Sequence, residues 1–115
     1  MSTQGKTWGE TTEFYKTDSL SAHYLKIKAG GFCSEHRHQR KSNTFFIISG
    51  ELEVYIWKEK NVIDTTILGP GQITEVPPDV YHKFHAQTDC ECIEIYQVKL
   101  QEPDIERRTR GGLRK

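Results

Sequence analysis

The chain has 115 residues, and its 16 Lys and Arg residues balance 16 Asp and Glu residues, so its formal net charge is zero. This length suits a single domain with one modest core, and the balanced charge does not favour nucleic acid or an anionic membrane as a partner. Residues 1–17 contain no basic and apolar leader, and no apolar run reaches the length of a membrane span, so we expect a cytoplasmic protein.

Short runs rich in Val, Ile, Phe and Tyr, each ended by turn residues, follow one another from Ala22 onward. This spacing is typical of all-β sandwiches and barrels. We predict strands at residues 22–28, 44–49, 50–57, 62–68, 72–76, 80–86 and 90–100, and an extended strand around His36 and His38. About eight antiparallel strands closed into a jelly-roll β-barrel would leave room inside for a small ligand.

Three segments follow from this pattern. Residues 1–21 are expected to form an N-terminal arm that packs on the barrel, and residues 22–100 form the barrel itself. Residues 101–115 contain Pro103, two adjacent glycines and five basic residues from Arg107 onward, which predicts a C-terminal segment with a basic tail. A solubilising tail is the simpler interpretation, and a binding arm is the alternative.

Two histidines, His36 and His38, stand one residue apart. In an extended strand, side chains at this spacing point to the same side, so both imidazoles could bind one metal ion at about 2.0 to 2.1 Å. The best third ligand is His82, because the turn at residues 77–79 can bring the next strand alongside the first. Such pairs also arise by chance, and hydrogen-bonded or surface histidines remain the alternative.

The order and spacing of these residues resemble the two motifs of the cupin superfamily. The first motif has G, five residues, HxH, three or four residues, E, six residues and G, and the matching residues are Gly30, His36, His38, Asn43 and Gly50. The second motif has G, five residues, PxG, two residues and H, and the matching residues are Gly71, Pro77, Asp79 and His82. The chain departs from the pattern twice, with Asn43 in place of the acid and Asp79 in place of a glycine.

Two further segments narrow the resemblance. KTWGE at residues 6–10 and EPDIERR at residues 102–108 look like the ends of the cupin domain that closes the type II mannose-6-phosphate isomerases. The resemblance then covers residues 6–112 and implies a single cupin domain. It also implies that His36, His38 and His82 bind a divalent transition metal: zinc, iron, nickel, manganese or copper.

The asparagine changes what this resemblance implies. Asn43 occupies the position of the family's carboxylate ligand, and an amide oxygen can coordinate a cation but adds no negative charge. We therefore expect Asn43 to be a weaker fourth ligand, and loss of the metal is an open alternative.

The predicted strands contain one candidate catalytic residue and several candidate pocket residues. Glu94 lies in the middle of an apolar strand: facing inward, its pKa would rise and suit a general base, whereas facing outward it would be solvated. Aromatic residues that could line the pocket, or else pack in the core, are Phe45, Tyr55, Tyr81, Phe84 and Tyr96.

The resemblance implies an isomerase or epimerase acting on a sugar, a sugar phosphate or a similar polar metabolite. A three-histidine Fe(II) dioxygenase and a non-catalytic ligand-binding cupin are the alternatives. Arg37, Arg40 and Lys41 beside the proposed site favour an anionic ligand, although a solvated loop explains them equally well. Barrels of this size often pair through an edge strand, so we expect a homodimer.

Overall fold

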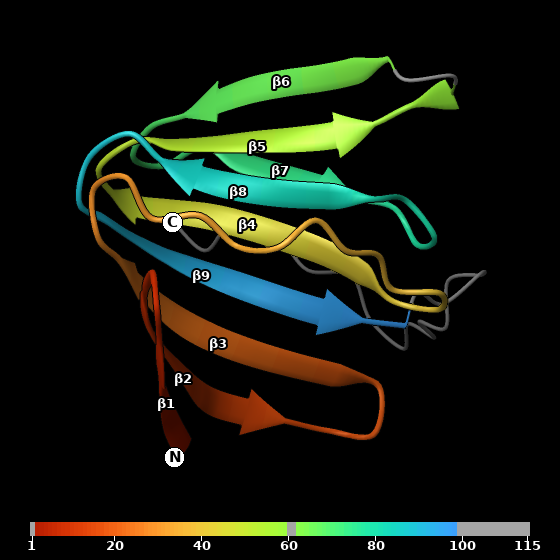
Figure 1. The fold of residues 1–115 in the computed structure, drawn as a ribbon. Coiled ribbons are helices and arrows are strands. Elements are labelled where there is room, and N and C mark those ends of the chain that lie inside the picture. The colour runs from red at the N-terminus through yellow and green to blue at the C-terminus, as the bar shows by residue number, and fades with distance from the viewer. Residues whose placement is uncertain (1, 60–61, 99–115) are drawn as a thin grey trace, which may run out of the picture.

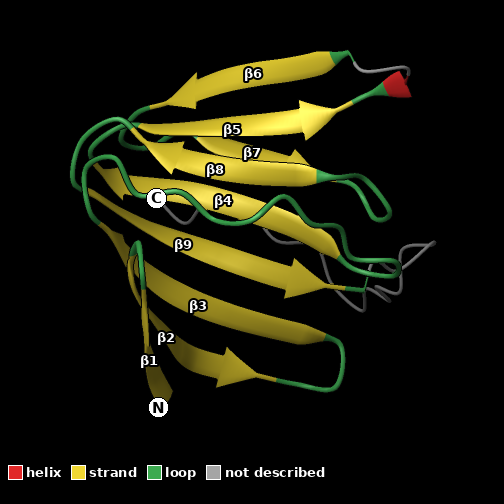
Figure 2. Ribbon diagram, in the orientation of Figure 1, coloured by secondary structure: helices red, strands yellow, loops and turns green. Residues whose placement is uncertain are grey.

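The computed structural model describes residues 2–59 and 62–98, which form two facing antiparallel sheets (Figure 1). Strands and loops account for almost all of this part of the chain (Figure 2), and no helix in it is long and apolar enough to cross a bilayer. The nine strands are β1 (Ser2–Lys6), β2 (Gly9–Lys16), β3 (Leu20–Ile27), β4 (Ser42–Ser49), β5 (Leu52–Trp57), β6 (Ile63–Leu68), β7 (Ile73–Val76), β8 (His82–Ala86) and β9 (Cys90–Gln97). The larger sheet has the order β1-β2-β3-β9-β4-β7, and the smaller one has the order β6-β5-β8.

This arrangement confirms the all-β fold and corrects two details. The seven apolar runs from Ala22 onward form β3 to β9, but the predicted strand around His36 and His38 is not regular. That segment is an extended connector between β3 and β4, and isolated bridges join Phe32 to His85 and His36 to His82. The expected arm at residues 1–21 contains β1 and β2, whereas residues 101–115 lie outside the described ranges.

The strands β1 and β2 were missed because they carry few apolar side chains. Their sequences, STQGK and GETTEFYK, lack the runs of large aliphatic residues that marked the later strands. They form because β2 pairs with β3 over most of its length and β1 pairs with β2. Their strand structure therefore depends on ladder hydrogen bonds to an already formed sheet.

The inner face of the larger sheet changes character along its strands. At one end, the register places Leu25, Cys92 and Ile47 side by side on β3, β9 and β4, and all three are fully buried. Two residues further along, it places His23 beside Glu94, and the next inward row continues with Tyr96 beside Asn43. One end of the barrel interior is therefore apolar, and the other carries polar side chains.

Residues from both sheets make the core at the apolar end. Leu52, Val54 and Ala86 of the smaller sheet are fully buried against the larger sheet. The cluster consists of Leu25, Ile27, Phe45, Ile47, Leu52, Val54, Leu68, Val76, Phe84, Ala86, Cys90 and Cys92. Cys33, Cys90 and Cys92 are free thiols, so within the described residues this barrel is held by packing and hydrogen bonding.

Two positions of the cupin motifs lie in turns and have a positive φ. Gly50, between β4 and β5, has a φ of 80°, and a Cβ there would lie 2.1 Å from the Asp89 carbonyl oxygen. Asp79 stands where the cupin pattern has glycine and keeps a positive φ of 63°. Aspartate tolerates this region better than most residues, so the turn that leads into β8 is preserved at a small cost.

Candidate metal centre

Backbone hydrogen bonds bring the histidine segments together. The His36 amide donates to the His82 carbonyl at 3.1 Å, and the His82 amide donates back to the His36 carbonyl at 2.8 Å. The Asp79 amide donates to the His38 carbonyl at 2.6 Å, which attaches the turn before β8 to the connector. Residues more than 40 positions apart in the chain are thereby held side by side.

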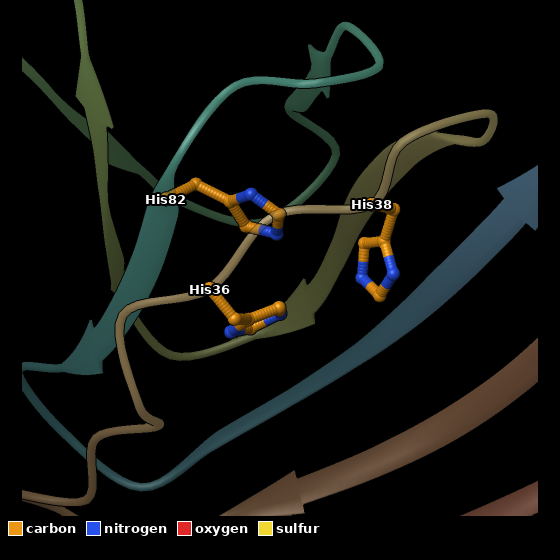
Figure 3. A group of neighbouring side chains, drawn as sticks. All are labelled: His36, His38 and His82. Atoms are coloured by element: carbon orange, nitrogen blue, oxygen red, sulfur yellow. The ribbon is translucent and has the colours of Figure 1, made fainter.

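The three imidazoles converge at the polar end of the barrel (Figure 3). Figure 3 shows the His36 and His38 rings on the connector and the His82 ring reaching toward them from the start of β8. One ring nitrogen from each lies within 4.8 Å of the others. The ring centroids of His36 and His82 are 4.4 Å apart, and those of His36 and His38 are 5.2 Å apart.

The hydrogen bonds of these rings leave nitrogen lone pairs for a metal. His36 Nδ1 lies 2.7 Å from the Ser34 carbonyl and His82 Nδ1 lies 3.0 Å from the Val80 carbonyl, so each Nδ1–H donates and each Nε2 keeps its lone pair. His38 Nε2 is buried and has no hydrogen-bond partner among the described residues. The side chains therefore fit a divalent transition metal.

Burial keeps two of the rings neutral. It lowers the pKa of His82 to about 4, helped by the neighbouring His36 and His38 rings and opposed by the hydrogen bond to Val80. Burial also lowers the pKa of His38, and His36 and Lys41 add to this effect. Neutral imidazole is the form that binds a metal ion.

Asn43 reaches the centre from β4 and is almost fully buried, with 1% of its surface exposed. Its Nδ2 lies 3.0 Å from His82 Nε2 and donates to Glu94 Oε2 at 3.1 Å, while its Oδ1 is buried without a partner. Because His82 Nε2 and Glu94 Oε2 both accept, the orientation with Nδ2 toward them is the one that these hydrogen bonds require. Asn43 therefore lies against the histidine cluster as a proton donor, and its amide would have to make half a turn to offer a metal on His82 Nε2 a weak oxygen ligand.

Glu94 faces inward, which settles the alternative that the strand pattern left open. It is buried, and its carboxyl group is hydrogen-bonded by Asn43 and Tyr96. Burial raises the pKa of Glu94 to about 7, and the two hydrogen bonds oppose that rise. Burial also raises the pKa of Tyr96, whose ring contacts His38 with centroids 4.9 Å apart.

A cavity of about 590 Å³ opens beside these groups. His36, Glu94 and Tyr96 line it from the connector and β9, and Gln4, Thr11 and His23 line it from β1, β2 and β3. Gln4, Thr11 and His23 were not predicted from the sequence to be site residues. The available signal was the period-two spacing of Thr11 and Glu13, which matches the inward positions of β3. Residues 9–16 had not been predicted to form a strand.

The five aromatic residues considered as pocket lining lie in four places. Phe84 and Tyr96 line the cavity, whereas Phe45 is buried in the core with its ring 6.1 Å from that of Phe84. Tyr55 is on the smaller sheet, hydrogen-bonded to Glu53 and covered by the Lys83 ammonium group. Tyr81 is 44% exposed.

The contacts of the basic residues in the connector do not favour a simple anion-binding site. Arg37 Nη1 lies 3.3 Å from Asp79 Oδ1, and the guanidinium group lies 4.8 Å from the centre of the Tyr81 ring. Arg40 and Lys41 are exposed. Arg37 therefore links the two histidine segments at the rim of the site.

Solved structures share this fold at low sequence identity. KdgF from Halomonas sp. is 20% identical with a TM-score of 0.69, over 80% of each chain. An RmlC-like cupin from Shewanella frigidimarina is 23% identical with a TM-score of 0.67, over 80% of this chain and 78% of that one. Bacillus subtilis oxalate decarboxylase, described with Mn(II) centres, is 18% identical with a TM-score of 0.76, over 84% of this chain and 27% of that one.

Sequence comparison agrees with the fold. No curated protein sequence matches the chain significantly, and the narrower resemblance to mannose-6-phosphate isomerases stays a prediction. Residues 23–96 match the family described as "Cupin domain". This segment holds the three histidines, Asn43 and Glu94. The chain therefore belongs to the cupin domain family.

Proposed function

We propose that this protein is a metal-dependent cupin that acts on a sugar, a sugar phosphate or a similar small polar metabolite by isomerase-like proton transfer. The observation that carries this proposal is the position of Glu94. Its buried carboxyl group lines the same cavity as His36 and is held by the Asn43 amide and the Tyr96 hydroxyl. A carboxyl group fixed beside a metal-binding cluster is suited to move a proton on a bound ligand.

The histidines and Asn43 would hold the metal. His36, His38 and His82 would hold a divalent transition metal, with Asn43 as a weaker fourth ligand. When bound, such a metal supplies Lewis-acid polarisation of a carbonyl or hydroxyl oxygen. Three imidazoles favour zinc, iron, nickel, manganese or copper over the harder magnesium ion.

Glu94 would act as the general base. Interconversion of an aldose and a ketose needs a group that removes a proton from one carbon and returns it to the next. The Asn43 and Tyr96 hydrogen bonds fix the direction of the carboxyl group, and burial keeps bulk water away from it. Lys6 is the cationic side chain among the described cavity residues and could meet an anionic group.

Deuterium exchange tests this proposal. Metal-loaded protein is incubated in D2O with mannose 6-phosphate, glucose 6-phosphate or fructose 6-phosphate, and deuterium at carbon 1 or 2 is followed by NMR. We expect exchange with at least one compound, and a loss of at least about 100-fold in Glu94→Gln. Metal content of the variant, measured by elemental analysis, must equal that of the wild type. Exchange that is unchanged in Glu94→Gln would remove Glu94 from the mechanism.

Two alternatives rest on the asparagine. The Asn43 amide lies against His82 Nε2, the atom that a metal needs, which favours a non-catalytic cupin that binds its ligand without a metal. In that case His82→Ala would lose metal and keep ligand affinity. Among the described residues the histidine cluster contains no carboxylate, which favours a three-histidine Fe(II) dioxygenase. Stoichiometric zinc in protein purified without a histidine tag or chelator would argue against it.

We also propose a homodimer. Among the described strands, β1 and β7 lie at the edges of the larger sheet, where a second copy could add a strand. Sedimentation equilibrium would show a monomer if this proposal is wrong.

A further inference from the structure

A second polar site adjoins the cavity that His36 and Glu94 line, which we call the metal cavity, on the side of the first three strands. Gln4, Thr11 and His23 line the metal cavity, and the same three residues with Glu13 line a neighbouring hollow of about 350 Å³. We call Gln4, Thr11 and His23 the outer subsite. Because both hollows share these side chains, a ligand that leaves the metal cavity in this direction must pass over them.

The outer subsite continues the inner face that carries Glu94. His23 on β3 is the register partner of Glu94 on β9, and Glu13 on β2 is the register partner of His23. Gln4 on β1 is the partner of Thr11 on β2. The strands β1 and β2 precede residues 23–96, so the polar face extends beyond the segment that matches the cupin family.

Hydrogen bonds orient the polar atoms of the outer subsite. Ser21 Oγ donates to Glu13 Oε2 at 2.9 Å, so it must accept from His23 Nε2 at 2.7 Å. Nδ1 of the neutral His23 ring then holds a lone pair and accepts from Thr11 Oγ1 at 3.4 Å. With its hydrogen used in this way, the Thr11 hydroxyl presents lone pairs to the cavity.

A bulge follows the end of this chain of hydrogen bonds. The β2–β3 register shifts between Glu13 and Tyr15, directly after the residue that ends the chain. Bulges of this kind redirect the neighbouring side chains and are frequent beside functional sites. The bulge therefore lies directly beside Glu13, the residue at which the chain of hydrogen bonds ends.

We propose that the outer subsite binds hydroxyl groups of a polyhydroxylated ligand whose other end lies at His36 and Glu94. A hydroxyl group can donate to Thr11 Oγ1, and the Gln4 amide can both donate and accept, so adjacent hydroxyls on one carbon chain suit the two residues. This inference rests on the proposed function and sharpens it: the substrate would be recognised along its carbon chain and not only at its reacting end.

Binding of two matched acids tests the outer subsite. D-gluconate and 2-hydroxyhexanoate share six carbons and an α-hydroxy carboxylate, but only gluconate has hydroxyls further along the chain. Dissociation constants for zinc-loaded protein are measured by calorimetry, with zinc content checked before and after. We expect gluconate to bind more tightly than 2-hydroxyhexanoate. Thr11→Val should weaken the binding of gluconate by roughly 3- to 10-fold and leave the affinity for 2-hydroxyhexanoate unchanged.

Thr12→Val is the matched control. Thr12 is the next residue of β2 and points to the opposite face, where it pairs with Tyr24 and its hydroxyl is hydrogen-bonded to the Thr3 hydroxyl. Removing the Thr12 hydroxyl should therefore leave the affinity for both acids unchanged. Equal affinity of the wild type for the two acids, or equal effects of the two threonine substitutions, would overturn the outer subsite and leave the metal centre intact. Failure of both acids to bind zinc-loaded protein would overturn the outer subsite together with the proposed ligand class.

Discussion

The two ends of the barrel interior use the same strands for different purposes. On β3, β9 and β4, the inward row of Leu25, Cys92 and Ile47 is apolar and fully buried. Two residues along β9, the inward position is Glu94, which is also buried but is held by hydrogen bonds. Strand alternation therefore decides only that a side chain faces inward, and the residue at that position decides whether it becomes core or site.

The contrast also separates two kinds of stabilisation. Apolar side chains at the first end stabilise the fold because they are removed from water, and this effect does not depend on the orientation of the contacts. Polar side chains at the second end are tolerated only because they bond one another, as Asn43 bonds both His82 and Glu94. The apolar end should therefore determine stability, and the polar end should determine binding and pH dependence.

The largest expected effect comes from the apolar end. Ile47→Ala removes a fully buried side chain and should lower the free energy of unfolding by about 2 to 5 kcal/mol. Ile48→Ala, at the next position of β4 and 40% exposed, should cost less than about 1 kcal/mol. Urea titration of both variants measures the difference. Equal losses would mean that the apolar row does not dominate stability.

Glu94 should make the stability of metal-free protein depend on pH. Its pKa rises from 4.5 to about 7 on folding, so the native state holds more protons between these values and loses stability as pH rises through them. The loss is ~3 kcal/mol above pH 7. The lowered pKa values of His38 and His82 act in the opposite direction at lower pH, so Glu94→Gln serves as the reference.

Denaturant titrations of wild type and Glu94→Gln at several pH values, with a chelator present, give the comparison. The variant should resemble the wild type near pH 4 and become relatively more stable toward pH 8. A difference between the two proteins that is constant with pH would contradict the raised pKa of Glu94.

Asn43 should limit metal affinity. Asn43→Asp keeps the size of the side chain and adds a charged oxygen beside His82, which should tighten zinc binding by roughly 10-fold, or about 1.4 kcal/mol. The same change should destabilise metal-free protein, because the new carboxylate lies next to Glu94. Competition against a chelator of known affinity measures the first effect. Unchanged zinc affinity would mean that residue 43 does not contact the metal.

The smallest effect is expected at the turn before β8. Asp79→Gly relieves a positive φ of 63° and should stabilise the protein by about 0.5 kcal/mol, since the exposed Arg37 pair that it loses is worth less than about 1 kcal/mol. Asp79→Asn tolerates the same backbone angle without the charge and isolates the contribution of the ion pair. A lower midpoint temperature of thermal unfolding in Asp79→Gly than in the wild type would show that the ion pair with Arg37 stabilises the protein by more than the positive φ costs.

Much of the barrel could be predicted from local patterns. The runs that became β3 to β9 combine apolar residues with clear turn signals, and the motif spacing identified His36, His38 and His82 before their rings were seen together. The strands β1 and β2 could not be recognised in this way, because their pairing with β3 supplies what their composition lacks. The outer subsite was missed for the same reason.

The sequence by itself determined the alternation of each strand, the turns between them and the types of side chain available to bind a metal. The tertiary structure decided that Glu94 faces inward, that Asn43 lies against His82 and that Thr11 and His23 reach the cavity. Alternation has a period of two and is silent on which of its two faces is inside. That choice depends on pairing between strands far apart in the chain, and it is made only when the two sheets pack against each other.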